Sequence, residues 1–156
     1  MPRLRSVGVA LSAVAISATA CAAGASPSTS AAGSFAIPHT TVDVTLREFA
    51  ITPETYAVVA GQVTFHITNL GSEHVHEFVL LKTDLAGDSL PTRSDGSVDE
   101  QDARVKVIGK VQGLPVGESK DLTVSLDGGW YVLVCNMVEG GVVHYQMEKG
   151  IPFFVD

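Results

Sequence analysis

Most of the side chains that commonly bind transition metals lie in two short segments of this 156-residue sequence. Residues 69–78 (NLGSEHVHEF) contain two histidines, and residues 130–147 (WYVLVCNMVEGGVVHYQM) contain a cysteine, a histidine and two methionines. A thiolate, two imidazoles and a weak thioether form the donor set of a type-1 copper site, because the soft thiolate suits Cu(I) while imidazole suits both oxidation states. We therefore expect a copper site where the two segments meet.

The sequence predicts β-strands for the elements that must hold these side chains. Apolar and polar residues alternate over 42–46 (VDVTL), 63–68 (VTFHIT) and 122–126 (LTVSL), which is typical of strands with one buried face. Turn signals such as Ala60-Gly61 and Asp127-Gly128-Gly129 separate the runs, and the last strand is expected at 151–155. Many short strands in one chain of this length predict an all-β sandwich or barrel, with the ligand segments at strand ends of one pole.

Residues 82–103 interrupt this pattern. The segment is acidic, contains Gly, Ser and Pro, and shows no apolar period. Its aspartates do not have the spacing of an EF-hand calcium loop. We expect a long, solvated surface loop.

The candidate ligands each compete with a simpler interpretation. Cys135 could be a buried apolar thiol, and His144, with eight residues between it and Cys135, could be a histidine that binds nothing. The second imidazole belongs to His74 or His76, which point to opposite faces of a strand.

The quoted motifs resemble the cupredoxins, in particular secreted bacterial type-1 copper domains. The resemblance rests on Asn69-x-Gly71, His76-Glu-Phe78, the run from Gly129 to Asn136 (GWYVLVCN) and His144-Tyr145, and it spans roughly residues 40–156. It implies a cupredoxin-like Greek-key β-sandwich or barrel of about seven to eight strands over residues 38–156. It also implies one type-1 copper bound by His76, rather than His74, together with Cys135 and His144. The long spacing from Cys135 to His144 is similar to that of copper nitrite reductase domains.

The axial position departs from the family pattern. Cupredoxins usually have Met five residues after the second histidine, where this chain has Lys149. Met147 is therefore the first candidate for a weak axial ligand, ahead of an empty axial position and of Glu148. Asn69 and Asn136 are expected to form hydrogen bonds that stitch the two ligand loops together.

The resemblance implies a one-electron carrier, not an enzyme. Electrons are expected to pass through His144, which in cupredoxins reaches the surface within an apolar patch; here Val142, Val143 and Tyr145 could form it. The alternatives are a copper chaperone or buffer, and a metal-free or zinc-binding accessory lipoprotein. A closed mononuclear site leaves no position for a substrate, and no nucleophile elbow of the G-x-S-x-G type is present in the sequence.

The N-terminus predicts export from the cytoplasm. Arg3 and Arg5 precede an uncharged run over 6–20 that ends in small residues, so residues 1–20 are interpreted as a signal peptide. Cys21 follows directly, as in a bacterial lipobox, although the same residues also suit ordinary secretion. Residues 21–37 form a Ser/Ala/Gly-rich tether. We expect a lipoprotein anchored through Cys21 to the outer face of the cytoplasmic membrane.

The net charge of the chain limits the kinds of molecule that it can bind. Ten basic and seventeen acidic residues give the chain a formal net charge of -7. Nucleic acid is excluded as a partner, since binding it depends on neutralising phosphates with Lys and Arg. We expect a monomer with a cationic redox partner, and contact with a membrane only through the lipid anchor at Cys21.

Overall fold

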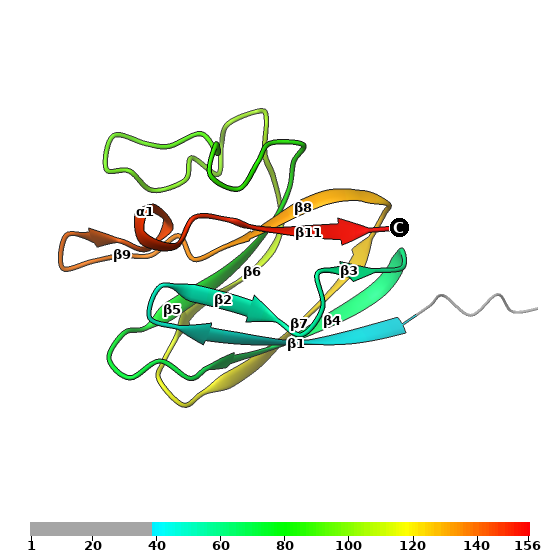
Figure 1. Ribbon diagram of the computed structural model, residues 1–156, viewed down its shortest axis with the longest axis horizontal. Helices are drawn as coiled ribbons and strands as arrows, with labels where there is room; N and C mark the ends of the chain where they lie inside the picture. Colours follow the sequence, from blue (N-terminus) through cyan, green and yellow to red (C-terminus); the bar gives the residue numbers. More distant parts are fainter. Residues whose placement is uncertain (1–38) are drawn as a thin grey trace, which may run out of the picture. The chain divides into compact units, whose positions relative to one another are not determined.

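The computed structural model describes residues 39–156, and the predicted signal peptide, tether and Cys21 lie outside this range. No helix in the described part is long and apolar enough to cross a membrane. The described residues form eleven strands and one short helix (Figure 1): β1 His39–Arg47, β2 Ala50–Pro53, β3 Ala57–Val58, β4 Gly61–Asn69, β5 His76–Lys82, β6 Lys106–Leu114, β7 Ser119–Leu126, β8 Gly129–Val134, β9 Val138–Glu139, β10 Val142–Val143, α1 His144–Glu148 and β11 Ile151–Val155.

The strands form two main sheets and a separate hairpin. The first sheet has the order β2-β1-β4-β7, and the second has the order β3-β11-β8-β5-β6. Strands β1 and β4 are parallel, whereas β5 is antiparallel to both of its neighbours. The hairpin β9–β10 lies in the chain between β8 and α1, within the ligand-rich segment. The all-β prediction is confirmed.

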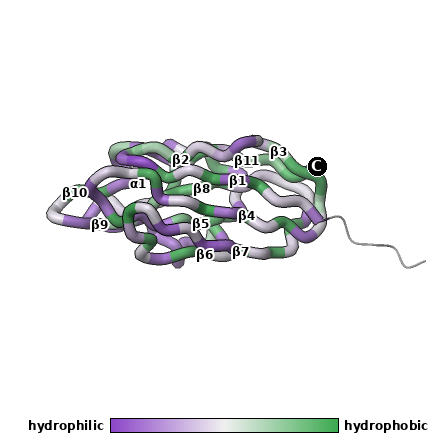
Figure 2. The backbone as a smooth tube through the Cα atoms, turned by 90° about the horizontal axis from the view of Figure 1, so that it is seen from below, coloured by the Kyte–Doolittle hydropathy of each residue, from purple (hydrophilic) through white to green (hydrophobic). Residues whose placement is uncertain are grey.

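The main core lies between the sheets, where the alternation in the sequence places it. On β4, Val63, Phe65 and Ile67 are fully buried, and the ring of Phe65 lies 5.3 Å from Phe78 and 5.5 Å from Phe153, centroid to centroid. Offset and edge-on contacts of this kind add stability beyond that from buried area. Figure 2 shows hydrophobic segments recurring along the strands of both sheets. The core therefore holds together the two sheets from whose strand ends the ligand segments extend.

The segment over 82–103 is not the solvated loop that its composition predicts, and the connection from β5 to β6, residues 83–105, is here called the excursion. Leu90, Val98 and Val105 are buried in a second apolar cluster with Val79 and Leu81 of β5. Central strand β5 is therefore buried on both faces, one against the first sheet and one under this excursion. The prediction was wrong because the segment carries too few apolar residues to show a period, yet Leu90, Val98 and Val105 cover the outer face of the second sheet.

Candidate metal centre

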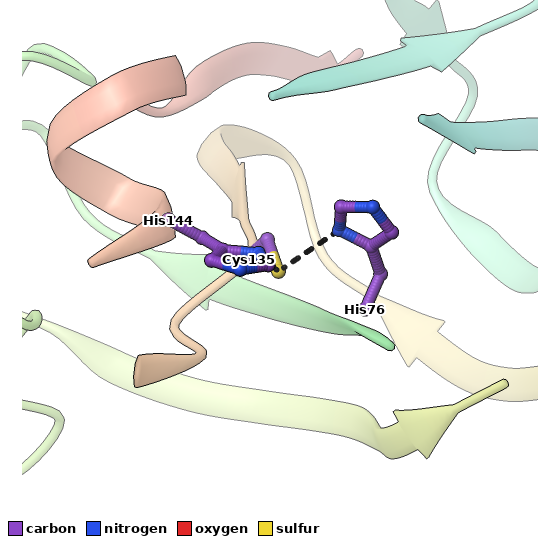
Figure 3. A group of neighbouring side chains, drawn as sticks. All are labelled: His76, Cys135 and His144. Carbon is purple, nitrogen blue, oxygen red and sulfur yellow. Dashed lines mark hydrogen bonds between the residues drawn. The ribbon is translucent and has the colours of Figure 1, made fainter. Parts of the chain in front are cut away.

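The structure brings His76, Cys135 and His144 together at one end of the second sheet (Figure 3). His76 opens β5, and Cys135 directly follows β8. These strands pair antiparallel, so the start of one lies beside the end of the other. His144 is the first residue of α1, to which the hairpin β9–β10 returns the chain after Cys135. Strand pairing and a returning hairpin thus bring together residues that are far apart in the sequence.

The three side chains present suitable donor atoms to one another. The sulfur of Cys135 lies 3.3 Å from Nδ1 of His144 and 3.6 Å from Nδ1 of His76. Each side chain is at most 1% exposed, and Nε2 of both histidines is buried without a hydrogen-bond partner. One thiolate and two imidazole nitrogens within this distance fit one type-1 copper ion.

Burial determines the protonation of the donors. Desolvation raises the pKa of the Cys135 thiol to about 11, although the backbone N–H of Glu77 donates to its sulfur at 3.2 Å and opposes the rise. Desolvation also lowers the pKa of both His76 and His144. Without a metal the thiol is therefore protonated and the imidazoles are neutral at pH 7. A metal ion binding there must displace one proton, from Cys135.

The structure does not bring Met147 to this cluster. Its side chain is 60% exposed on the last turn of α1, so the first-ranked axial candidate lies at the surface. Glu148 is the next residue, and both of its carboxylate oxygens are buried with no hydrogen-bond partner. It follows His144 by four residues and so lies on the same face of the helix turn. Glu148 is nevertheless absent from the group of mutually close donors in the described residues.

Glu148 still affects the centre electrostatically. Burial raises the pKa of this carboxyl group to about 8, and its charge contributes to the raised pKa of Cys135. A buried acid therefore lies close enough to the thiol to affect its protonation.

Asn69 organises the loop that leads to His76. Its Nδ2 donates to the carbonyl oxygens of His74 and Leu114 at 3.0 and 2.9 Å, and its Oδ1 accepts from the N–H of Gly71 at 2.9 Å. These bonds tie the end of β4 to the end of β6 and to residues 71–74. They position the first ligand segment, but they do not reach the second.

Asn136 organises the second ligand segment in a similar way. Its side chain accepts from the N–H of Val98 at 2.6 Å, donates to the carbonyl of Val98 at 3.1 Å and donates to Glu100 at 2.9 Å. It joins the residue after Cys135 to the excursion. The two ligand segments are linked directly by the bond from the N–H of Glu77 to the sulfur of Cys135 and by the contact between His74 and Glu139.

His144 does not reach the surface, contrary to the expectation for an exposed electron-transfer histidine. It is fully buried, and Tyr145 is 2% exposed because its hydroxyl group donates to Gly87 O at 3.0 Å and accepts from the N–H of Leu90 at 3.2 Å. The ring of Phe49 covers His144 edge-on, with 5.7 Å between the ring centroids. Of the three expected patch residues, Tyr145 is therefore buried and only Val142 and Val143 reach the surface.

The cover over His144 contains His74, which was a candidate ligand, and also Glu48, Phe49 and Glu139, which no motif in the sequence indicated. His74 lies 5.8 Å from His144, centroid to centroid, and its Nδ1 lies 3.2 Å from Oε2 of Glu139 on β9. Glu48 accepts from the backbone N–H groups of residues 72–74, which lowers the pKa of its carboxyl group to about 2. The turn that holds Glu48 and Phe49 has no spacing that relates it to the ligand motifs, so no sequence signal could have found it.

The other histidines lie away from the cluster, as expected for surface residues. His66 on β4 is 44% exposed and pairs with Asp121 on β7 at 2.5 Å. His39 contacts the hydroxyl group of Thr64 at 3.1 Å. Neither belongs to a group of mutually close metal-type donors within residues 39–156.

Comparison with solved structures shows the same architecture in known copper proteins. Auracyanin from Roseiflexus castenholzii superposes with a TM-score of 0.52 at 18% identity, covering 78% of this chain and 99% of that one. Rusticyanin from Thiobacillus ferrooxidans superposes at 0.51 and 15% identity, covering 74% and 77%. Another rusticyanin structure, described as that of a copper protein, also superposes at 0.51 and 15% identity, covering 74% and 78%. No family model and no curated protein sequence matches the chain.

These neighbours are cupredoxins, so the described domain has the cupredoxin fold. At this level of identity the comparison concerns the fold alone. The chemistry of the centre rests on the buried donors of this chain.

Proposed function

We propose that this protein binds one copper ion at His76, Cys135 and His144 and acts as a one-electron carrier. The observation that supports this most directly is the buried cluster of one thiol and two imidazoles at a strand end of a cupredoxin fold. A copper ion held there supplies a one-electron couple. The proposal includes no catalytic turnover, because His76, Cys135 and His144 are at most 1% exposed.

The residues around the cluster suit repeated electron transfer. Pairing of β5 with β8 fixes two of the donors, and the hydrogen bonds of Asn69 and Asn136 restrain the loops beside them. The N–H of Glu77 donates to the sulfur and so stabilises negative charge on it. A frame held in this way changes little when the charge of the centre changes, which keeps the reorganisation energy low.

Direct voltammetry tests the carrier role. The copper-loaded protein should give a reversible one-electron wave. Absence of a reversible wave from a protein that holds copper in the thiolate site would contradict it.

A copper buffer or chaperone is the second candidate, and the buried His144 favours it. Phe49, His74 and Glu139 cover this imidazole, so it should transfer electrons to a partner more slowly than an exposed imidazole would. This role predicts slow electron self-exchange together with tight Cu(I) binding. NMR line broadening in mixtures of reduced and oxidised protein distinguishes the two roles.

We also propose that the protein works outside the cytoplasm, attached by lipid at Cys21. Support comes from Arg3, Arg5 and the uncharged run that precedes Cys21. Mass spectrometry of the protein from membranes should show an acylated N-terminal Cys21. Recovery from the soluble fraction with an unmodified residue after position 20 would indicate simple secretion.

A further inference from the structure

The centre of the proposed copper site is closed to solvent, so an ion must reach it past side chains that cover it. His76 and Cys135 are 1% exposed and His144 is 0% exposed. His74 and Glu139 lie outward of His144, with side chains 32% and 47% exposed. They are the solvent-accessible residues of a second group of metal-type donors, and His144 is its third member.

The geometry of this outer group suits a metal ion. One donor atom from each of His74, Glu139 and His144 lies within 4.8 Å of the others. Because Nδ1 of His144 faces the sulfur of Cys135, the other nitrogen of the ring, Nε2, is left, and it is buried with no hydrogen-bond partner. Two imidazoles and a carboxylate are ligands that Cu(II) and Zn(II) accept. An unpartnered buried nitrogen distinguishes this group from an ordinary surface ion pair.

We propose that His74, Glu139 and Nε2 of His144 form an outer metal site that takes up copper from solvent and passes it to His76, Cys135 and His144. This inference rests on the proposed copper function. In the transfer, Cu(II) exchanges the nitrogen of His74, the oxygen of Glu139 and Nε2 of His144 for the nitrogen of His76, the sulfur of Cys135 and Nδ1 of His144. The proton that the His144 ring carries on Nδ1 in the outer complex leaves to solvent, and Nε2 takes one up. The thiol proton leaves to solvent, and the oxidation state of copper does not change.

Two features make the transfer short. The imidazole of His144 belongs to both groups, so the ion moves between the two nitrogens of one ring. His74 precedes His76 by two residues on the loop that Asn69 and Glu48 restrain, which keeps the outer site next to the inner one.

The chain offers a matched control. His66 and Asp121 form another exposed pair of histidine Nδ1 and carboxylate, at 2.5 Å. They bridge β4 and β7 and belong to no group of three metal-type donors in the described part of the chain. Removing this pair removes a surface ion pair of the same kind without touching the outer site.

Stopped-flow loading tests the proposal. The full-length apo protein is mixed with aqueous Cu(II), and the growth of the thiolate-to-copper absorption band is followed. His74→Ala and Glu139→Gln should each slow loading at least tenfold while reaching the wild-type final intensity, and His66→Ala should load at the wild-type rate. Wild-type rates in both outer-site variants would overturn the proposal, as would equal slowing in all three.

A second measurement isolates the outer site. In Cys135→Ala, which lacks the thiolate, bound Cu(II) should give an electron paramagnetic resonance spectrum with nitrogen and oxygen ligands, and adding His74→Ala should weaken its affinity at least tenfold. Unchanged affinity would overturn the outer site. If the wild-type protein itself forms no thiolate band, the copper function fails as well, whereas a normal band with unaltered loading rates removes the outer site alone.

Discussion

Cys135 is the residue on which the chemistry of the centre depends, and its burial links metal binding to pH. Since the pKa of the thiol is raised to about 11, the free protein holds its proton throughout the neutral range. Binding of copper therefore releases one proton from this residue.

The apparent copper affinity should increase about tenfold for each pH unit between pH 7 and 9. In this range both imidazoles are already neutral, because the pKa values of His76 and His144 are lowered. Competition titration with a chelator of known pH dependence measures the slope. The matched variant Cys135→Ser should bind weakly with little slope, and a flat profile for the wild-type protein would contradict a thiolate ligand.

Glu148 makes a separate prediction for the metal-free protein. Burial raises the pKa of its carboxyl group from 4.5 to about 8, so between these values the folded state holds a proton that the unfolded state has lost. The contribution of this group to the free energy of unfolding should fall by roughly 1.4 kcal/mol per pH unit as pH rises through that interval.

Glu148→Gln removes this dependence because the amide stays neutral. Urea unfolding of the apo protein from pH 5 to pH 8 should show the variant becoming progressively more stable relative to wild type. Parallel profiles for the two proteins would show that the carboxyl group ionises freely in the folded state.

At this scale the sequence predicted the three donors that the structure brings together and missed what covers them. The cysteine and histidines share strand-end motifs, so their types and spacing were informative. Met147 was favoured over Glu148 by ligand chemistry, but the short helix turns the thioether outward and the carboxylate inward. Helix orientation over five residues is set by tertiary contacts, which no periodicity in so short a segment records.

At the scale of elements, the excursion over residues 83–105 positions the helix that carries His144. The carbonyl of Gly87 accepts from the N–H of Gly150 at 2.9 Å and from the Tyr145 hydroxyl group at 3.0 Å. Gly87 and Gly150 approach so closely that a Cβ at Gly87 would lie 2.0 Å from the carbonyl oxygen of Gly150. These hydrogen bonds to Gly87 of the excursion therefore hold both ends of the segment from Tyr145 to Gly150 in place.

Gly87→Ala should lower the free energy of unfolding by about 3 kcal/mol, because the backbones must separate and the contacts of Tyr145 are strained. Denaturant unfolding measures the change. The control Gly128→Ala places its Cβ no closer than 3.6 Å to another atom and should change stability by less than about 0.5 kcal/mol. Equal effects of the two substitutions would show that the close approach does not matter.

The strands themselves were largely readable from the sequence, whereas the excursion was not. Alternation over 63–68 matches β4 because one face of this strand is buried, and the last strand expected at 151–155 is β11. On β5 the residues from Phe78 to Leu81 are all apolar, so Val79 and Leu81, which face away from the first sheet, required a cover. That requirement was the available signal that residues 83–105 pack onto the sheet instead of extending into solvent.

At the scale of the whole molecule, we expect the acidic charge to govern association. The chain has a formal net charge of -7, and loss of residues 1–20 would remove Arg3 and Arg5 and no acidic residue, leaving eight basic and seventeen acidic residues, a net charge of -9. Such a charge attracts cationic partners and repels anionic ones over a distance that salt shortens.

Electron transfer with small inorganic complexes should show this steering. The rate constant with a cationic ruthenium hexaammine complex should fall as ionic strength rises from 0.01 to 0.5 M, a range over which screening shortens the Debye length from about 30 Å to a few ångströms. The rate constant with anionic hexacyanoferrate should rise over the same range. Stopped-flow kinetics measure both, and salt-independent rates would indicate that net charge does not reach the site of transfer.

The central claim is that Cys135, His76 and His144 together bind copper through a thiolate, and the visible absorption spectrum tests it most directly. Cu(II) is added to the purified apo protein and, in parallel, to Cys135→Ser. An intense thiolate-to-copper band should appear at one equivalent in the wild-type protein and be absent in the variant. A colourless wild-type protein, or a band that persists in Cys135→Ser, would contradict it.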